Sequence, residues 1–304
     1  MSTGVVVMAY GTPRAPGEIL AYYTDIRRGR PPEPEQLADL IRRYDAIGGL
    51  SPLARITNAQ RDTLQATLDR RAPGQYQVEV GLKHVMPRIA DAVGTLIGRG
   101  ADEVVGLVLA PHYSAMSVGH YHEQAGEAAT AQGVAYRPID SWATLPAYVE
   151  FLAADLRHRL DALPAGTRAV FTAHSLPRRI LDHGDPYPDE LRSTATAVAA
   201  AAGLAAERWQ LGWQSAGRTP EPWLGPDILE IIDTAAADGQ TPGMLVCPCG
   251  FVADHLEILY DLDIEARQRA ERHGLAFDRT TSLNTEPTVF EALAELVETA
   301  AVGS

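Results

Sequence analysis

VVVMAYGTP at residues 5–13 and AVFTAHSLP at residues 169–177 follow one pattern: an apolar strand, a polar residue, and a turn that ends in proline. Both runs are apolar without alternation, as is typical of parallel strands covered on both faces. Two further segments also recur: VEVGLKHVMPRIADAV (78–93) resembles WQLGWQSAGRTPEPWLGPDILEII (209–232), and VVGLVLAPHYS (104–114) resembles GMLVCPCGFVA (243–253). The chain is therefore predicted to be a duplicated α/β protein.

Stretches of helical periodicity separate the strands. Strands are expected at 5–8, 77–81, 104–110, 169–172, 209–213 and 243–247, and helices at 35–44, 58–71, 87–98, 148–163, 190–201, 226–237 and 253–273. Such alternation predicts parallel sheets with right-handed crossovers. The first copy is longer, because 71 residues separate Tyr10 from Gly81 whereas 38 separate His174 from Gly212. About 33 extra residues thus fall within 14–58, and loops of that length are usually functional.

The composition and the absence of common motifs exclude several classes of protein. The chain has 26 Lys and Arg against 39 Asp and Glu, a net charge of −13, which disfavours a nucleic-acid binder. The longest apolar run, 104–111, is far shorter than the ~20 residues of a membrane span, and no signal peptide is recognisable at the start. A cytoplasmic protein is expected. Phosphate loops, nucleophile elbows and zinc-protease helices are missing from the sequence.

Polar residues follow the ends of the predicted strands. They are Tyr10, His84, His112, His174, Gln214 and the turn 250–257. Ligands of open parallel sheets bind beyond the carboxyl ends of the strands, so these residues predict one cleft between two facing domains. Tyr10 and His174 occupy equivalent positions in the two copies, although a structural role for a histidine at a strand end is equally open.

An acidic series follows the last of these turns. In GFVADHLEILYDLDIEA (250–266), Glu257, Asp261 and Glu265 are spaced i, i+4, i+8 and would share one helical face, drifting by about 40° per step. Like charges at that spacing repel, yet the flanking residues are apolar. A line of carboxylates entering the interior needs protons or a cation, and histidine with carboxylate suits divalent metals, including Fe²⁺. A solvated helix face is the alternative.

A positive island lies in the extra segment. IRRGRPPEP (26–34) groups three arginines, whose guanidinium forks bind carboxylate or phosphate, although chance clustering on the surface explains them equally well. RYDAIGGLSPLARIT (43–57) is consistent with a lip over a flat apolar ligand. The histidines of HYSAMSVGHYHE (112–123) do not match the spacing of a closed zinc site. Cys247 and Cys249 are expected to be buried apolar side chains, with metal handling as the alternative.

Together these stretches are similar to the ferrochelatase family, whose members insert Fe²⁺ into a porphyrin. The resemblance runs from about Val5 to Pro287 through nine ordered motifs: MAYGTP, YYTDIRRGRPPEPE, RYDAIGGLSPLARIT, GLKHVMP, VLAPHYSAMSVGHYHE, AHSLP, GDPYP, GWQSAGRTPEPWLGP and GFVADHLEILYDLDIEA. The tyrosine of MAYGTP, without a C-terminal extension or membrane segment, is most similar to the monoderm-type branch that uses coproporphyrin III.

The resemblance implies two Rossmann-like domains, each a parallel sheet flanked by helices, with the porphyrin cleft between them. We place the first at 1–142 with an inserted porphyrin-lip segment at about 14–58. The second lies at 143–286 and carries His174 and Glu257. A C-terminal helix at 287–304 is expected to pack back on the first domain.

The resemblance also implies roles for individual residues. His174 and Glu257 match the catalytic pair that faces the incoming Fe²⁺, and Tyr10 matches a tyrosine that approaches the metal from the opposite face. Asp261 and Glu265 match an outer cation site, where Mg²⁺ is one candidate. The positions that match porphyrin contacts are Tyr10, Arg27, Arg43, Tyr44, Ser51, Tyr121 and His84.

The implied protein is a lyase of haem biosynthesis with Fe²⁺ and a tetrapyrrole as substrates, and without an organic cofactor. CPCGF departs from the branch, in which valines flank the proline, but two cysteines are too few for a [2Fe–2S] cluster and none is expected. We expect a monomer with transient contacts to other haem-pathway enzymes, and neither a nucleic-acid partner nor an integral membrane segment.

Three alternatives stay open beside coproporphyrin III: insertion into protoporphyrin IX, insertion into sirohydrochlorin, and a carrier that holds a tetrapyrrole without turnover. Sirohydrochlorin carries more carboxylates and would call for more arginines than the 26–34 loop offers. A carrier gains nothing from the carboxylate series that begins at Glu257. A two-domain protein that binds a small ligand lacks a secretion signal and is the least favoured.

Overall fold

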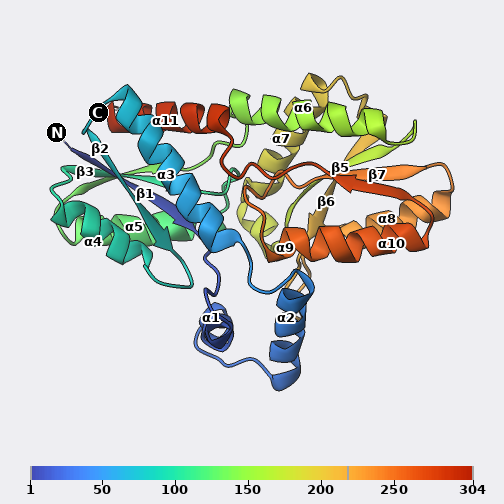
Figure 1. Cartoon of the computed structure of the whole chain (residues 1–304), viewed down its shortest axis with the longest axis horizontal. Coiled ribbons are helices and arrows are strands. Elements are labelled where there is room, and N and C mark those ends of the chain that lie inside the picture. Colours follow the sequence, from blue (N-terminus) through green and yellow to red (C-terminus); the bar gives the residue numbers. More distant parts are fainter. Residues whose placement is uncertain (1, 218, 303–304) are drawn as a thin grey trace.

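The computed structural model describes residues 2–217 and 219–302, and in this part of the chain the strands form two four-stranded sheets (Figure 1). Arg218 of the GWQSAGRTP motif and the last two residues of the predicted 287–304 segment lie outside the described residues. The first sheet has the order β2-β1-β3-β4 and the second has the order β6-β5-β7-β8, with every pairing parallel. The same order twice confirms the predicted duplicated α/β fold.

The strands are β1 (Thr3–Ala9), β2 (Tyr76–Leu82), β3 (Glu103–Val108), β4 (Ala135–Ile139), β5 (Arg168–His174), β6 (Trp209–Gln214), β7 (Gly243–Cys247) and β8 (Ala276–Arg279). The helices are α1 (Ile19–Ile26), α2 (Pro34–Ala46), α3 (Leu53–Arg71), α4 (Ile89–Gly98), α5 (His120–Thr130), α6 (Pro146–Ala162), α7 (Tyr187–Ala201), α8 (Ile228–Asp238), α9 (Leu256–Leu259), α10 (Arg267–Arg272) and α11 (Pro287–Val302). Two π-helical turns, Ala115–Gly119 and Asp261–Ala266, precede α5 and α10.

The central strands are apolar throughout because each of their faces is covered. In β1, Val5 and Val7 join the core beneath α3, whereas Val6 and Met8 join the core beneath α4 and α5. Successive strand side chains point to opposite faces, so a strand between two helical layers needs no polar positions.

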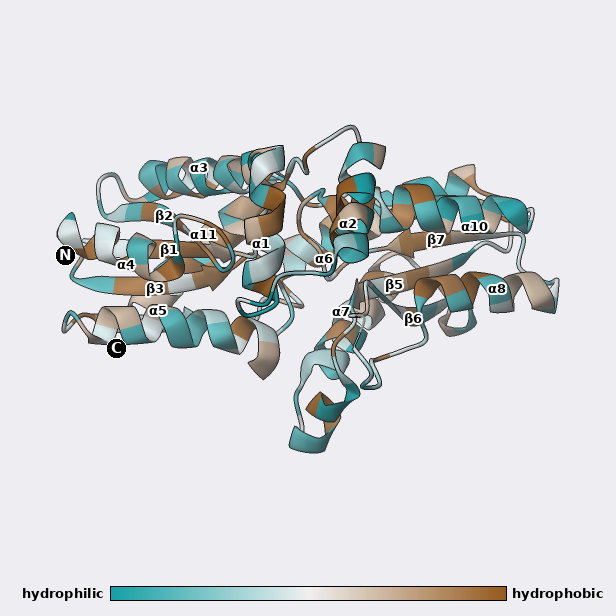
Figure 2. Ribbon diagram, turned by 90° about the horizontal axis from the view of Figure 1, so that it is seen from below, coloured by the Kyte–Doolittle hydropathy of each residue, from teal (hydrophilic) through white to brown (hydrophobic). Residues whose placement is uncertain are grey.

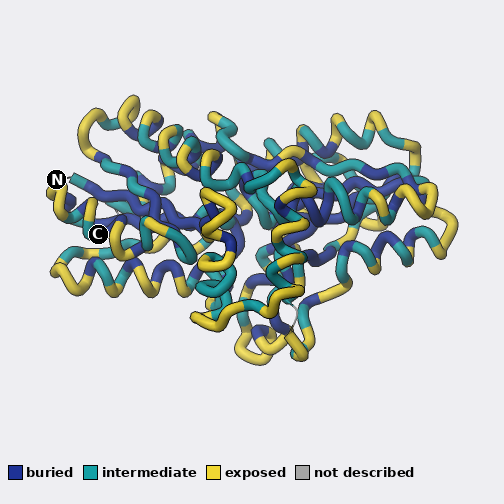
Figure 3. Tube along the Cα trace, turned by 60° about the horizontal axis from the view of Figure 1, so that its bottom comes forward, coloured by how far each residue is buried: buried dark blue, intermediate teal, exposed yellow. Residues whose placement is uncertain are grey.

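One apolar core extends across both sheets. It includes Val5 of β1, Leu64 of α3, Tyr148 of α6, Phe171 of β5 and Phe290 of α11, all 0–1% exposed. Figure 2 shows the sheets side by side with helices on both faces, and Figure 3 shows the buried trace running between the two halves. The halves are therefore joined by packing as well as by the chain.

The extra segment of the first half forms a lobe of two short helices. Figure 1 shows α1 and α2 projecting together from one side of the molecule, beside the junction of the halves. Each buries a single residue, Ile19 in α1 and Tyr44 in α2. None of the helices in the described ranges is long and apolar enough to cross a membrane.

The prediction of one continuous helix over 253–273 is wrong. The segment begins with a loop, forms α9, widens into the π-helical turn Asp261–Ala266, and continues as α10. Strands β4 and β8 and helices α1 and α5 were not expected individually. AYRPI in β4 and AFDR in β8 lie at the sheet edges, where partly polar sequences lack a buried-strand signal.

Gly250 allows the turn after β7 to pack closely against β5. A Cβ at this position would overlap Ala173 Cβ of β5 and lie 2.7 Å from its Cα. We expect Gly250→Ala to reduce the free energy of unfolding by about 1–3 kcal/mol, as overpacking of a dense core does. Urea denaturation measures the change. Gly98→Ala is the control, because a Cβ at Gly98 meets nothing within 4 Å; equal stability of both variants would contradict the prediction.

Candidate active site

The first half presents Tyr10 and His84 from adjacent strand ends. The ladder between β1 and β2 continues past both strands, with Lys83 N donating to Ala9 O at 3.0 Å and His84 N donating to Tyr10 O at 3.1 Å. The two rings lie 4.4 Å apart between centroids. His84 Nδ1 donates to Asp25 Oδ2 at 2.7 Å. Burial lowers the pKa of His84 despite that carboxylate, so the ring is held neutral with Nε2 as its acceptor.

Asp25 is itself fixed by a guanidinium. Arg88 donates to Asp25 Oδ1 at 2.6 Å and to Asp25 Oδ2 at 3.2 Å. The hydrogen bonds from Arg88 lower the pKa of Asp25, so its carboxylate stays ionised. An arginine, a carboxylate and a histidine thus form one chain behind Tyr10, in which each group orients the next.

The second half presents His174, the last residue of β5. Its Nδ1 lies 2.5 Å from Ser175 O, which can only accept, so Nδ1 carries the hydrogen and Nε2 carries the lone pair. Ser175 N donates to Gln214 O at 2.8 Å, and Tyr187 Oη donates to His174 O at 3.0 Å. These bonds fix the backbone on both sides of the imidazole.

Glu257 is brought to His174 by the turn after β7. Gly250 N donates to Thr172 O at 3.0 Å, and Gln214 Nε2 donates to Glu257 O at 3.0 Å, so the turn is anchored to β5 and β6. His174 Nε2 then lies 3.8 Å from Glu257 Oε2. The pair is accessible, since the two side chains are 37% and 32% exposed.

A second histidine approaches the same carboxylate oxygen. His255 Nε2 lies 3.8 Å from Glu257 Oε2, while His255 Nδ1 lies 2.8 Å from Ala253 O and must donate to it. Burial works against a charge on His255, but Glu257 outweighs burial and raises the pKa of His255. Burial likewise opposes ionisation of Glu257, yet His174 and His255 hold its pKa at about 2.

The two imidazoles and the carboxylate form a set of acceptors around one point. With both Nδ1 atoms committed to backbone carbonyls, each imidazole turns its Nε2 atom toward the same anionic oxygen. Facing acceptors are favourable only when a proton or a cation lies between them. Among residues 2–217 and 219–302, however, no three His, Cys, Asp or Glu side chains are spaced as a finished metal site. The set therefore suits a passing proton or metal ion.

The π-helical turn carries the carboxylate series away from Glu257. Glu265 N donates to Tyr260 O at 2.9 Å, an i→i−5 bond that gives this turn more residues than an α-helical turn. In an α-helix the residue at i+4 is rotated around the helix axis past the residue at i, whereas in the wider π-helical turn it falls short of it. The side chains of Glu257, Asp261 and Glu265 consequently stay closer to one line along the helix.

Asp261 is the most enclosed member of the series. Its Oδ1 lies 3.3 Å from Arg43 Nη1 of α2, and its Oδ2 accepts from Ser215 Oγ at 2.5 Å. Burial and the nearby Glu257 raise the pKa of Asp261 to about 7, despite the bonds from Ser215 and Arg43. Arg43 also lies over the Tyr260 ring, 4.8 Å from its centroid. The lobe thus touches the carboxylate series across the junction.

Tyr10 faces this series from the other half. Burial, followed by Glu257, Asp25 and Tyr44, raises the pKa of the Tyr10 hydroxyl well above its usual value. The ring is nevertheless 40% exposed, because it lies open to the junction. A neutral hydroxyl thus stands opposite an anionic carboxylate.

The remaining sequence-predicted contacts surround these groups at different depths. Tyr44, Ser51 and Tyr121 are 3–8% exposed. Tyr44 Oη lies 3.4 Å from Thr12 Oγ1, Ser51 Oγ accepts from Leu53 N, and Lys83 Nζ lies 5.0 Å from the Tyr121 ring centroid. Arg27 packs over Tyr23 at the base of the 26–34 loop. Tyr44, Ser51 and Tyr121 are therefore almost fully enclosed, whereas Arg27 is only partly buried.

His112 does not join the site. It is 2% exposed, and its Nε2 lies 2.8 Å from Thr194 Oγ1. Burial lowers its pKa to about 3. His122 bonds Tyr136 Oη and Ile139 O, while His120 is exposed, so the histidines of 112–123 lie in three environments. Both cysteines are buried and free, and burial raises the pKa of Cys249. The structure thus favours packing roles for His112, His122 and the two thiols.

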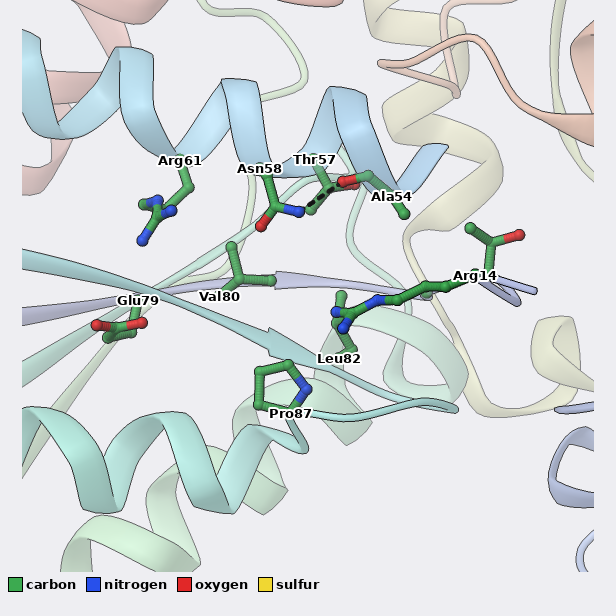
Figure 4. Close-up of a pocket in the computed structure, with 11 residues that line it drawn as sticks. Arg14, Ala54, Thr57, Asn58, Arg61, Glu79, Val80, Leu82 and Pro87 are labelled. Carbon is green, nitrogen blue, oxygen red and sulfur yellow. Dashed lines mark hydrogen bonds between the residues drawn. The ribbon is translucent and has the colours of Figure 1, made fainter. Parts of the chain in front are cut away.

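A pocket of about 230 Å³ lies elsewhere, between α3 and the edge strand β2. Figure 4 shows Arg61 and Asn58 of α3 pointing toward Val80 of β2, with Arg14 across the opening. It contains none of the predicted site residues. We therefore assign the candidate site from its chemistry and not from cavity volume.

Sequence reasoning missed four residues of the site: His255, Ser215, Asp25 and Arg88. The signal for His255 was present, because it stands two residues before Glu257 in the most unusual stretch of the chain. Asp25 likewise lies inside the YYTDIRRGR motif. Ser215 lies inside the GWQSAGRTPEPWLGP motif. Arg88 carried no signal, since only the folded chain brings it to Asp25.

Comparison with known proteins gives one family. A family profile described as Ferrochelatase matches residues 2–301. The chain is 44% identical to a coproporphyrin III ferrochelatase of Geobacillus kaustophilus (strain HTA426) over 97% of this chain and 95% of that protein. It is 41% identical to a coproporphyrin III ferrochelatase of Bacillus subtilis (strain 168), over 97% and 96%.

Solved structures agree on the fold. SirB from Bacillus subtilis with Fe³⁺ superposes with a TM-score of 0.59 at 12% identity, covering 100% of this chain and 97% of that chain. CbiX, described as the terminal enzyme for siroheme biosynthesis in denitrifying bacteria, gives 0.55 at 16% identity, covering 99% of both. At these identities the likeness concerns architecture alone.

Asp261→Asn should change how stability depends on pH. The folded pKa near 7 lies above the ordinary carboxyl value of 3.8. Protonated Asp261 therefore stabilises the fold below about pH 4, and this contribution is lost as the pH rises through 7. Each unit between the two pKa values corresponds to roughly 1.4 kcal/mol. Asparagine does not ionise, so the variant should gain stability relative to the wild type between pH 5 and pH 8.

Urea unfolding of the metal-free protein at pH 5, 6.5 and 8 measures this effect. Asp45→Asn, at an exposed position of α2, is the control and should follow the wild-type profile. Parallel profiles for Asp261→Asn and the wild type would show that Asp261 does not titrate near neutrality.

Proposed function

This chain belongs to the ferrochelatase family, and from that premise we propose that it inserts Fe²⁺ into coproporphyrin III with release of two pyrrole protons. The product is the iron complex of coproporphyrin III, an intermediate of haem biosynthesis. The observation that carries the proposal is the Glu257 carboxylate, which lies 3.8 Å from both His174 Nε2 and His255 Nε2 at an accessible junction. Relatives at 41–44% identity that are named coproporphyrin III ferrochelatases support the substrate.

His174 is proposed to take the pyrrole protons. Its Nδ1 is committed to Ser175 O, so Nε2 is the nitrogen that can accept a proton toward the junction. Histidine is the side chain used most often for general acid–base catalysis. The carbonyl fixes the tautomer, much as a carboxylate does in other catalytic histidines.

Glu257 is proposed to receive Fe²⁺ together with the imidazoles. Two histidines and one carboxylate form a ligand type that suits Fe²⁺. A spacing of 3.8 Å without a closed site is consistent with a metal that is a substrate and must leave. Asp261, with a pKa of about 7, and Glu265 would then move protons or cations between this point and solvent.

The tetrapyrrole is proposed to lie between the two halves, with Tyr10 on one face and His174 on the other. The neutral hydroxyl of Tyr10, backed by His84, would approach the metal from the face opposite Glu257. Arg27, Arg43 and the buried Tyr44, Ser51 and Tyr121 would bind the propionates and the ring edge. Guanidinium–propionate pairs at the rim supply remote binding energy, which can support bending of the macrocycle.

The outer carboxylates do not fit a resident Mg²⁺ ion in this arrangement. Both oxygens of Asp261 have partners, Arg43 and Ser215. No third ligand completes a site within the described ranges. We therefore propose that Asp261 and Glu265 transfer protons or cations between Glu257 and solvent and do not hold a resident metal ion. The two cysteines of the chain are half of what a [2Fe–2S] cluster needs, so the proposal involves none.

Anaerobic insertion assays with two porphyrins test the substrate. We expect many turnovers of Fe²⁺ into coproporphyrin III and few into protoporphyrin IX, followed as loss of free-base porphyrin absorbance with substrate in large excess. Four propionates give coproporphyrin more partners for the arginines of the rim than the two of protoporphyrin. Equal rates with the two porphyrins would leave the family assignment unchanged but would contradict the proposed preference for coproporphyrin III. Tight one-to-one binding without turnover would favour a carrier.

Variants test the proposed roles. We expect His174→Ala and Glu257→Gln each to lower kcat by at least about 100-fold, the range of a lost general base or metal ligand. His158→Ala and Glu123→Gln, at exposed helix positions, are the matched controls and should keep the wild-type rate. Full turnover by both His174→Ala and Glu257→Gln would mean that the site is wrongly placed.

A further inference from the structure

We propose that Arg279 of β8 is a positioning residue for iron insertion, because its fork ties the loop before His255 and the π-helical turn after Glu257 to one guanidinium. The inference rests on the proposed function and adds a residue that touches neither iron nor porphyrin. Arg279 Nε and Nη2 donate to the two oxygens of Asp263 at 2.7 and 2.8 Å, and Nη2 also lies 3.3 Å from Asp254 Oδ1.

The π-helical turn needs an anchor. Such turns are rare and are tolerated where surrounding structure fixes them. Relaxation to an α-helix would shift every following residue around the axis by one position, turning Asp261 and Glu265 away from their common line. Asp263 lies between them in this turn, and its two-point bond to a planar guanidinium fixes both the position and the rotation of the turn.

Arg279 Nη2, which also bonds Asp263, fixes the loop that presents His255. Asp254 accepts from Arg279 and Ser282 on Oδ1 and from Asn284 on Oδ2, while its backbone N donates to Asn284 Oδ1. His255 follows directly. The same guanidinium thus sets the approach of His255 to Glu257 and the direction in which the carboxylates continue.

The arrangement also explains why one acidic residue stands outside the series. Asp263 is neutralised by Arg279, whose side chain is 14% exposed, whereas Asp261 and Glu265 belong to the line proposed for passage. A fork is required for this task. A lysine ammonium keeps the charge but cannot hold both oxygens of Asp263 in one plane.

Steady-state kinetics of four variants test the proposal: Arg279→Lys, Arg279→Met, the double variant Arg279→Met with Asp263→Asn, and the control Arg159→Met. Arg159 pairs with Asp278 and Asp155 next to Arg279, with a side chain 28% exposed, but contacts neither the π-helical turn nor the 250–257 loop. We expect a KM for Fe²⁺ raised by about tenfold or more in the three Arg279 variants, as small misplacements of reacting groups cause. The Kd for coproporphyrin III, from fluorescence quenching, should stay within twofold.

Two comparisons distinguish a positioning role of Arg279 from an effect on protein stability and from an effect of its charge. The double variant should regain thermal stability over Arg279→Met, because the partly buried Asp263 carboxylate is no longer left without its counter-charge, but should not regain the KM for Fe²⁺. Arg159→Met should lower Tm while leaving that KM unchanged. If charge alone mattered, Arg279→Met would lower the KM for Fe²⁺ and the double variant would match the wild type, which would overturn the proposal. An unchanged KM in Arg279→Lys would overturn it as well. Failure of the wild type to insert iron in the same assay would instead refute the proposed function.

Discussion

A partly buried carboxylate needs compensating partners, and Glu257 is the group around which the site is organised. Two imidazoles approach one of its oxygens, His174 from the end of β5 and His255 from the loop between β7 and α9, and each is oriented by a backbone carbonyl rather than by a side chain. Backbone carbonyls at strand ends are fixed by the sheet itself. The position of His174 beside Glu257 therefore depends on the parallel register of β5 with β6 and β7, while the loop after β7 sets the position of His255.

Much of the fold followed from pattern. The unbroken apolar runs identified six strands, and the internal repeat predicted that both halves share one topology. Edge strands β4 and β8 were not predicted because they are short and mix polar with apolar residues, so they lack the unbroken apolar run of the central strands. The break in the 253–273 helix was not predicted for a different reason. An i, i+4 series reads alike for an α-helix and a π-helical turn, and only tertiary bonds such as Arg279 to Asp263 separate the two.

The sequence-based prediction of the candidate site consists mainly of groups that follow strand ends. Tyr10, His84, His174 and Glu257 were predicted because a strand signal precedes each polar residue or its turn, and the structure brings them to the junction of the two halves. Groups that act through a neighbour were missed, since pairs such as Ser215 with Asp261, or Arg88 with Asp25, are separated by 46 and 63 residues along the chain. His112 showed the opposite error, because a histidine after a strand is also used for packing, here against Thr194.

The apolar core shared by the two sheets has a mechanical consequence. Hinge opening between the halves would expose side chains such as Tyr148, Phe171 and Phe290 to water, which the hydrophobic effect strongly disfavours. Gln60 of α3 adds a polar tie by donating to Val252 O and Asn284 O. The α1–α2 lobe, by contrast, buries one residue per helix, and local motion is easiest where few contacts are lost. The α1–α2 lobe is therefore the segment that can move with the smallest loss of buried contacts, whereas movement of the packed halves that position Glu257 would cost much more.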